Sequence, residues 1–184
     1  MNSIKKIVVI GNGMVSLKFC EKLIEYGGLQ QYSVTVIGEE IRPAYDRVHL
    51  SEYFSGKTAD DLVLSPVSWY HENRIELKLG VRVDSVNKEM KSVLTSTGET
   101  LTYDALIFAT GSSPFVPKVE GVDKKGVFVY RTIEDLEAMT EYGKNSKSAA
   151  VIGGGLLGLE AAKAMLDLEL QSDTRLNLHN FLLF

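Results

Sequence analysis

The chain has 184 residues, of which 45% are hydrophobic and 24% charged, with a formal net charge of −4. This composition is ordinary for a globular protein and excludes a disordered or fibrous chain. The small negative charge, without a long run of Lys or Arg, gives no basis for a nucleic-acid partner or an anionic membrane surface. The length allows one domain of ordinary size and part of a second.

The amino terminus and the cysteine content favour a cytoplasmic protein. The apolar run at 7–10 is too short for a signal peptide, and no stretch approaches the length of a membrane span. Cys20 is the single cysteine, which excludes an internal disulfide and a Cys-x-x-Cys pair, and its place on the first predicted helix makes it a buried packing residue. We therefore expect no metal site and a cytoplasmic location.

The first 40 residues predict a strand, a helix and a second strand. Residues 4–10 form a continuous apolar run, which is typical of a parallel strand buried on both faces. Apolar residues then recur at helical spacing from Met14 to the pair Gly27-Gly28, and residues 33–37 are short and β-branched. This order is that of a βαβ unit.

The segment from 38 to 111 predicts a long loop followed by short elements. Residues 38–60 mix charges and aromatics without a period, apart from a short helix near 48–54, and loops of this length are usually functional. Turn residues between the last short runs favour an antiparallel meander. The elements predicted after the loop are a helical turn at 68–73, strands at 75–79, 81–87, 92–96 and 100–102, and a second buried strand at 103–109.

A second strand and helix pattern follows a domain boundary near 112–125, where two prolines mark a linker. Thr132 caps a predicted helix, with Asp135 three residues later in the arrangement of a capping box.

Two glycine-rich motifs, each between a predicted strand and a predicted helix, carry the candidate chemistry. In Gly-x-Gly-x-x-Gly the first glycine permits a tight turn, the second lets the backbone approach a pyrophosphate, and the third lets the helix pack on the strand. Residues 11–16 match this pattern except that Ser16 stands at the third glycine, a packing position. Residues 153–158 match it completely, between a strand at 148–152 and an alanine-rich helix at 159–168.

The two motifs differ in the acid that should bond a ribose hydroxyl about 20 residues later. Glu39 stands 23 residues after Ser16, directly after the second strand. The same count after Gly158 reaches Phe181, whose neighbours offer no carboxylate, and residues 174–180 alternate in a way that fits an exposed strand better than a buried parallel one. We therefore expect dinucleotide binding at the first motif and an incomplete second unit.

With "LIFATGSSP" at 106–114 between the motifs, the chain resembles the two-dinucleotide-binding flavoprotein reductases over residues 4–168. Within that superfamily it looks like the amino-terminal module of the large subunit of NAD(P)H-dependent assimilatory nitrite reductase. The closer resemblance is carried by "GNGMV" at 11–15, "RPAYDRVHLSEYFSGKT" at 42–58, "FVYRTIEDLEA" at 128–138 and "VIGGGLLGLEAA" at 151–162.

This resemblance implies an α/β fold with FAD in the first site and NAD(P)H in the second. The expected domains are a Rossmann-like FAD-binding βαβ domain with an antiparallel meander over 1–115, the start of an incomplete Rossmann-like NAD(P)-binding domain over 116–168, and an atypical tail over 169–184. Family members supply a later flavin-domain segment that this sequence lacks. We therefore expect a truncated or frame-shifted product, or a fragment.

The resemblance also assigns the site residues. Glu160 would sit near the flavin and the nicotinamide as the catalytic-site residue, with a surface helix glutamate as the alternative. Glu52 stands where rubredoxin and ferredoxin reductases have a lysine, which counts against that assignment. The cofactor-binding positions are Gly11, Asn12, Gly13 and Met14 at the pyrophosphate, Glu39 at the ribose, Arg47 and Ser51 near the pyrophosphate or flavin, Val83 at the adenine, Ala109, Thr110 and Gly111 along the cofactor, and Gly153, Gly155 and Gly158 in the second site. A solvated loop charge is the alternative for Arg47.

The implied function is a flavin-dependent NAD(P)H oxidoreductase module, which passes hydride from NAD(P)H to FAD. In a full-length parent, electrons would continue to an iron–sulfur and sirohaem module that reduces nitrite in nitrate assimilation. The alternatives are a non-catalytic FAD- or nucleotide-binding fragment, a fragment of a rubredoxin or ferredoxin reductase, and an unrelated NAD dehydrogenase with a single Rossmann domain.

Overall fold

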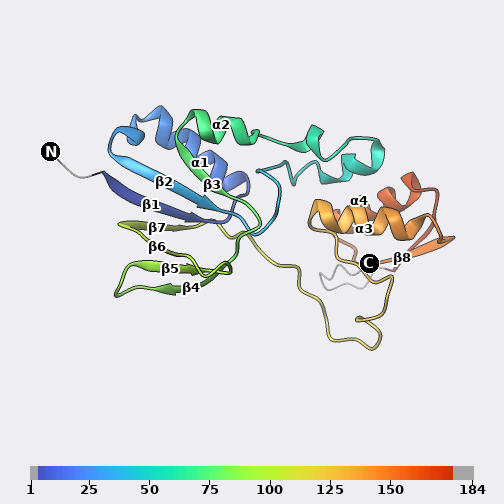
Figure 1. Ribbon diagram of the computed structural model, residues 1–184. Helices are drawn as coiled ribbons and strands as arrows, with labels where there is room; N and C mark the ends of the chain where they lie inside the picture. The colour runs from blue at the N-terminus through green and yellow to red at the C-terminus, as the bar shows by residue number, and fades with distance from the viewer. Residues whose placement is uncertain (1–3, 176–184) are drawn as a thin grey trace. The chain divides into compact units, whose positions relative to one another are not determined.

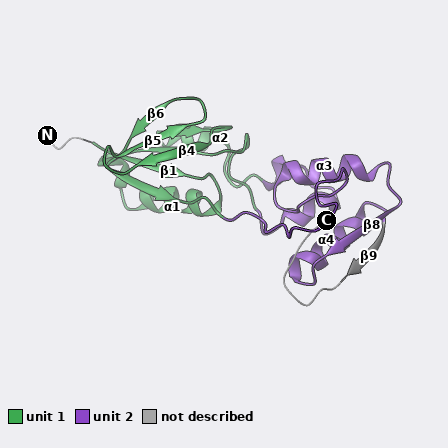
Figure 2. Ribbon diagram, turned by 90° about the horizontal axis from the view of Figure 1, so that it is seen from below, with its two compact units in different colours: residues 1–46, 63–111 green, residues 47–62, 112–184 purple. Residues whose placement is uncertain are grey.

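The computed structural model describes residues 4–175 of the chain, with side chains described for 4–170. Two compact units divide it: residues 1–46 with 63–111 form unit 1, and residues 47–62 with 112–184 form unit 2 (Figure 2). The long loop that the sequence analysis placed inside the first domain is thus shared, because its part from 47 to 62 groups with the second unit.

Unit 1 is built on a four-stranded parallel sheet with the strand order β3-β2-β1-β7 (Figure 1). Ile10 at the end of β1 pairs with Ile37 of β2 and with Phe108 of β7, so these strands end level with one another. Ligands of open parallel sheets bind at this carboxyl edge. The strands are β1 (Lys5–Ile10), β2 (Tyr32–Ile37), β3 (Ile75–Lys78) and β7 (Ala105–Phe108).

Two layers cover the sheet of unit 1, one on each face (Figure 1). Ile7 and Val9 of β1 face the helices, in a core that includes Cys20 and Tyr70. Val8 and Ile10 face the other side, where they pack with Val93 of the meander and its neighbours. The covering elements are α1 (Met14–Glu25), η1 (Gly28–Gln30), α2 (Val67–Glu72), β4 (Val83–Asn87), β5 (Ser92–Thr95) and β6 (Thr100–Thr102).

The structure confirms the first βαβ unit, the helical turn, the antiparallel meander and the buried position of Cys20. The prediction that 103–109 is a strand buried on both faces is wrong in one respect. Strand β7 has Ala105 and Phe108 exposed, because it lies at the edge of the four-stranded sheet. An apolar run indicates a strand but does not tell whether a neighbour covers it.

Unit 2 holds a two-stranded parallel sheet, β8-β9, with two α-helices. The capping box predicted at the start of α3 is present, since Thr132 accepts a hydrogen bond from the Asp135 amide and the Asp135 carboxylate accepts one from Thr132. The elements are η2 (Leu50–Ser55), η3 (Asp60–Leu62), α3 (Ile133–Gly143), β8 (Ser148–Ile152), α4 (Leu156–Asp167) and β9 (Gln171–Arg175).

Strand β9 corrects the interpretation of the chain after α4. We expected an exposed strand over 174–180 in place of a parallel one, whereas β9 begins at Gln171 and runs parallel to β8, with Ile152 opposite Arg175. Parallel pairing uses backbone groups alone, so the polar residues of β9 do not prevent it. The described second sheet nevertheless holds two strands, against four in unit 1. Phe181 and the rest of the tail after 175 lie outside the described residues.

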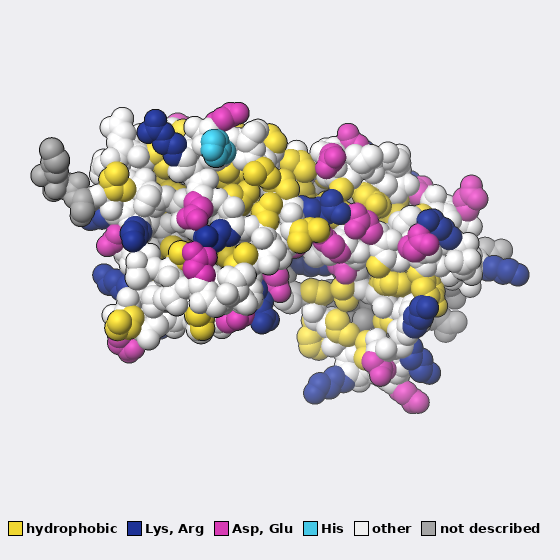
Figure 3. Space-filling view, in the orientation of Figure 1, with side chains coloured by type: hydrophobic (Ala, Val, Ile, Leu, Met, Phe, Trp, Pro, Cys, Tyr) yellow, Lys and Arg dark blue, Asp and Glu magenta, His cyan; other side chains and the backbone are white. Residues whose placement is uncertain are grey.

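The residues that the structure describes include no helix long and apolar enough to cross a lipid bilayer. Over the same range, no group of three or more His, Cys, Asp or Glu side chains is placed to hold a metal ion. Basic and acidic side chains are interspersed on the face drawn in Figure 3.

Candidate functional site

The first glycine motif forms a tight turn against the segment "ATG" at 109–111. Gly11 has φ +104°, a conformation that side-chain-bearing residues rarely adopt, and a Cβ atom on it would stand 2.2 Å from the Ala109 carbonyl oxygen. Backbone hydrogen bonds close the turn on both sides, from Gly11 to Ile37 and from Ala109 to Ile10, at 2.8 Å each. The structure therefore brings Gly11 of the first motif together with Ala109 and Thr110 of the later segment.

The amino terminus of α1 is open toward solvent beside the second glycine. Gly13 is the N-cap residue, no side chain caps the helix, and the first turn carries no acidic residue. A Cβ atom on Gly13 would meet no heavy atom within 4 Å. Uncapped first-turn amides and the partial positive charge of a 12-residue helix form an anion-binding site, and the space at Gly13 lets a diphosphate approach the backbone.

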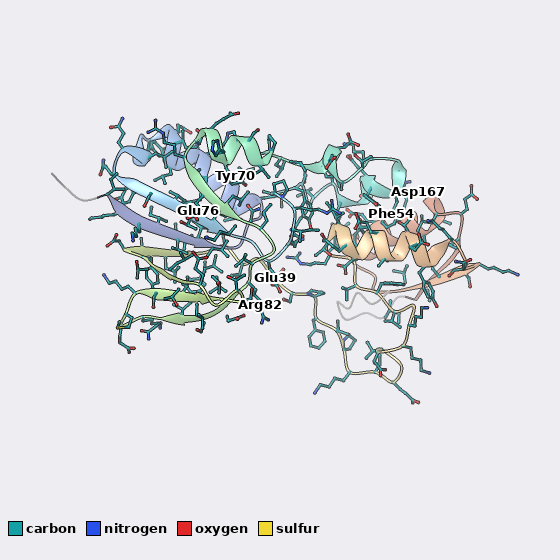
Figure 4. All side chains as sticks on the ribbon, viewed as in Figure 1. Glu39, Phe54, Tyr70, Glu76, Arg82 and Asp167 are labelled. Carbon is teal, nitrogen blue, oxygen red and sulfur yellow. The ribbon has the colours of Figure 1, made fainter. Side chains whose placement is uncertain are left out.

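Two adjacent glutamates follow β2, and the structure separates their roles. The Glu40 carboxylate accepts a 2.7 Å hydrogen bond from the buried Tyr45 hydroxyl. Glu39 is exposed at the carboxyl edge of the sheet (Figure 4). Glu39 is therefore the acid available to a ligand, while Glu40 holds the loop that follows β2.

Val83 is placed near this edge through the backbone. The Val81 amide donates to the Gly38 carbonyl oxygen at 2.9 Å, which ties the start of the meander to the end of β2. Val83 then enters β4 opposite Thr95.

Arg47 and Ser51 lie in unit 2, together with Tyr130 and Arg131. The Arg47 guanidinium donates a 2.9 Å hydrogen bond to the Arg131 carbonyl oxygen. Phe54 of η2 stacks on Tyr130, with ring centroids 6.3 Å apart and planes at 25°. Arg47 is thus hydrogen-bonded within unit 2 and half-buried.

The pKa of the Tyr130 phenol responds to Ser51 and to Glu160 of α4. Burial raises the pKa of Tyr130 to about 12, the negative charge of Glu160 acts in the same direction, and a hydrogen bond with Ser51 opposes the rise. The phenol therefore stays protonated and neutral at physiological pH. Glu160 itself is half-buried.

The second glycine motif repeats the geometry of the first. Gly153 is buried with φ +143°, Gly155 is the uncapped N-cap of α4 with no heavy atom within 4 Å of an added Cβ, and Gly158 is buried in the helix. By strand register the position equivalent to Glu39 is 177, two residues beyond Arg175, and the sequence has Asn there. That position lies outside the described residues.

An apolar cavity of about 370 Å³ lies elsewhere in unit 2, between α3, β8 and the segment 119–128. None of the predicted site residues lines it. Its lining includes residues 148–150 and Ile152 of β8.

Sequence reasoning missed four residues that shape these sites: Gly38, Tyr70, Tyr130 and Arg131. Gly38 carried a signal, because a glycine directly after a β-branched strand marks a close approach of backbone or side chain. Tyr70 carried none, and Tyr130 and Arg131 stood in the resemblance motif at 128–138 without an assigned role, since each acts on a residue that is distant along the chain.

The comparisons with known proteins agree with this geometry. A family model described as pyridine nucleotide-disulphide oxidoreductase matches residues 5–177. The chain is 46% identical to the nitrite reductase (NADH) large subunit of Escherichia coli strain K12 over 167 residues, and 47% identical to nitrite reductase [NAD(P)H] of Emericella nidulans over 175 residues. Each match covers 91% of this chain, but 20% and 16% of those relatives, so the chain spans a fifth or less of their length.

Among solved structures, the chain is similar to NADH:rubredoxin oxidoreductase from Clostridium acetobutylicum. The TM-score is 0.80 at 28% identity, over 94% of this chain and 44% of that one.

Proposed function

The chain belongs to the pyridine nucleotide-disulphide oxidoreductase family, and we propose that it is a flavin-dependent NAD(P)H oxidoreductase module with FAD at the first glycine motif and NAD(P)H at the second. The proposal extends to the site residues predicted from the sequence. Glu160 is the proposed catalytic-site residue, and the proposed cofactor contacts are Gly11, Asn12, Gly13, Met14, Glu39, Arg47, Ser51, Val83, Ala109, Thr110, Gly111, Gly153, Gly155 and Gly158.

The observation that carries the proposal is the open amino terminus of α1. Gly13 leaves space for a diphosphate beside uncapped amides, and Glu39 stands exposed at the same edge of the sheet. These groups fit the pyrophosphate and ribose of a dinucleotide, which need N–H donors and a carboxylate acceptor respectively.

The chain's own residues bind and orient the cofactors. The first-turn amides of α1 donate to the pyrophosphate, and Glu39 accepts from a ribose hydroxyl. The amides at the start of α4 do the same for the second dinucleotide. When bound, the nicotinamide and flavin groups supply the hydride transfer. Tyr130, whose pKa responds to Glu160 and Ser51, keeps a neutral hydroxyl throughout the physiological pH range.

The proposed place of the module is in an NAD(P)H-dependent nitrite reductase. Support comes from relatives that carry this name and are 46% and 47% identical to the chain. In such a parent, electrons from the reduced flavin would pass to an iron–sulfur and sirohaem module in the remaining sequence. The cytoplasmic location expected from the sequence remains a prediction.

Anaerobic titration of the purified chain, first with FAD and then with NADH or NADPH, tests the proposal. We expect FAD fluorescence to be quenched on binding and the visible absorbance of the bound flavin to bleach when the nicotinamide cofactor is added. The Gly13→Ala variant is the control for specific binding at the first motif.

Two outcomes would contradict the proposal in different ways. Binding of FAD without bleaching would favour a non-catalytic nucleotide-binding fragment. No binding of FAD, with retained binding of NADH, would assign the motifs to other cofactors.

A further inference from the structure

Asn12, the variable residue between the first two glycines of the motif, is held on three sides by the protein. The Tyr70 hydroxyl donates a 3.1 Å hydrogen bond to Asn12 Oδ1, and Asn12 Nδ2 donates to the Arg42 carbonyl oxygen at 3.4 Å. On the third side, a Cβ atom on Gly38 would stand 2.7 Å from Asn12 Cβ. The side chain of Asn12 is therefore turned into the protein, so a ligand at this turn meets its backbone.

Tyr70 is itself fixed. It lies between α2 and the sheet, with 1% of its surface exposed, in the core that α1 shares with β1 and β2 (Figure 4). Trp69 packs edge-on against its ring, with centroids 5.0 Å apart and planes at 88°. Its hydroxyl also receives a hydrogen bond from the Ala44 backbone. The hydroxyl is the donor toward Asn12, because the amide oxygen Oδ1 can only accept a hydrogen bond.

We propose that Tyr70 is a positioning residue for the pyrophosphate-binding turn, acting through Asn12. The Tyr70 hydroxyl and the Arg42 carbonyl oxygen hold the side-chain amide of Asn12. Asn12 in turn fixes the backbone between Gly11 and Gly13. That backbone carries the N–H groups that a diphosphate needs at the start of α1. The inference rests on the proposed cofactor site at residues 11–14.

Tyr70→Phe tests the proposal, because it removes the hydroxyl and keeps the ring. We expect FAD to bind about fivefold more weakly, since a hydrogen bond is worth about 1 kcal/mol and tenfold in affinity about 1.4 kcal/mol. In the chain without ligand, amide hydrogen exchange at Gly11, Asn12 and Gly13 should become faster by a similar factor.

The double variant Tyr70→Phe with Asn12→Ala separates positioning from general support. If Tyr70 acts through Asn12, the double variant binds FAD no more weakly than Asn12→Ala alone. Asn12→Ala removes the acceptor of the same hydrogen bond. If one of the two single variants does not fold, hydrogen exchange at the turn in the other variant still tests the proposal.

Asn73→Ala is the matched control. Asn73 lies at the end of the same helix and donates a 2.8 Å hydrogen bond to the Trp69 carbonyl oxygen, without touching the glycine turn. We expect this variant to lower the melting temperature while FAD affinity and exchange at residues 11–13 stay unchanged.

The proposal is overturned if Tyr70→Phe behaves as Asn73→Ala does, or if the effects of Tyr70→Phe and Asn12→Ala on FAD affinity add. Failure of the proposed function has a different signature. In that case the unchanged chain does not bind FAD, while hydrogen exchange at the turn still responds to Tyr70→Phe.

Discussion

Gly11 stands directly against Ala109: a Cβ atom added to Gly11 would lie 2.2 Å from the carbonyl oxygen of Ala109. This contact joins the first glycine motif to the segment "ATG" almost 100 residues later, and it is made by backbone that cannot move aside. Gly13 contrasts with it, because an added Cβ there meets no heavy atom within 4 Å. The two glycines of one motif therefore serve different ends, the first in folding and the second in leaving a space open.

Alanine substitutions at these glycines should separate folding from binding. Gly11→Ala is expected to lower the free energy of unfolding by about 2 kcal/mol or more, because a positive φ and a clash with backbone coincide. Gly13→Ala, at an N-cap, should lower the free energy of unfolding by less than about 1 kcal/mol. The same variant should weaken the binding of FAD at least about tenfold. Urea unfolding and fluorescence titration measure the two effects. Equal loss of stability in both variants would contradict the assignment of Gly13 to ligand binding.

Of the neighbouring acids, Glu39 should affect the binding of FAD and Glu40 should affect the stability of the fold. Glu39→Gln is expected to weaken FAD about tenfold, because a charged acceptor for a ribose hydroxyl is lost, while the melting temperature stays the same. Glu40→Gln should lower the melting temperature, since the buried Tyr45 hydroxyl loses its charged partner, with a smaller change in affinity. If Glu40→Gln has the larger effect on affinity, the ribose acid has been assigned to the wrong residue.

The regular elements and the glycine turns were predictable because they depend on local patterns. The spacing of apolar residues and the turn residues indicated β1, α1, β2 and the meander. The capping box was predicted because Asp135 follows Thr132 by three residues. Strand β9 could not be predicted in this way, because its residues "QSDTR" are polar and it pairs with β8 through backbone hydrogen bonds.

Contacts between distant residues could not be predicted from the sequence. Tyr70 and Asn12 are 58 residues apart, and Arg47 and Arg131 are 84 apart. The second pair fixes part of the long loop within unit 2, although its position along the chain favoured unit 1. Pattern reasoning placed Arg47 and Ser51 among functional residues through family resemblance, and it had no means of finding Tyr130 as their neighbour.

Cys20 should make unit 1 less stable at alkaline pH. Burial raises the pKa of the thiol from 9.0 to about 11 in the folded chain. The folded state therefore holds the proton more tightly than the unfolded state, and the resulting stability, at most about 2 kcal/mol, is present below pH 9 and lost as pH rises toward 11. Urea unfolding across this range measures the loss. Cys20→Ala should remove this part of the pH dependence, and an unchanged slope in that variant would assign the loss to other groups.

The cap of α3 should contribute measurable stability. Thr132→Ala is expected to lower the free energy of unfolding of unit 2 by about 1 kcal/mol, because the Asp135 amide loses its acceptor. Thr140→Val on the same helix is the matched control: within the described residues its buried hydroxyl has no hydrogen-bond partner, so its removal should be neutral or stabilising. Thermal unfolding followed by circular dichroism compares them, and equal losses would show that packing, not capping, holds the start of α3.

Ser16, the substituted third glycine of the first motif, is fully buried, and its hydroxyl has no hydrogen-bond partner among the described residues. Ser16→Ala should therefore raise the free energy of unfolding by about 1 kcal/mol, since a buried hydroxyl without a partner is destabilising. Ser16→Gly restores the motif but places a glycine in a helix, which costs about 1 kcal/mol relative to alanine. The expected order of stability is alanine first, with serine and glycine below it, measured by urea unfolding. Should glycine prove the most stable of the three, close packing of α1 on the sheet would outweigh both effects, and the side chain at this position would be under steric strain.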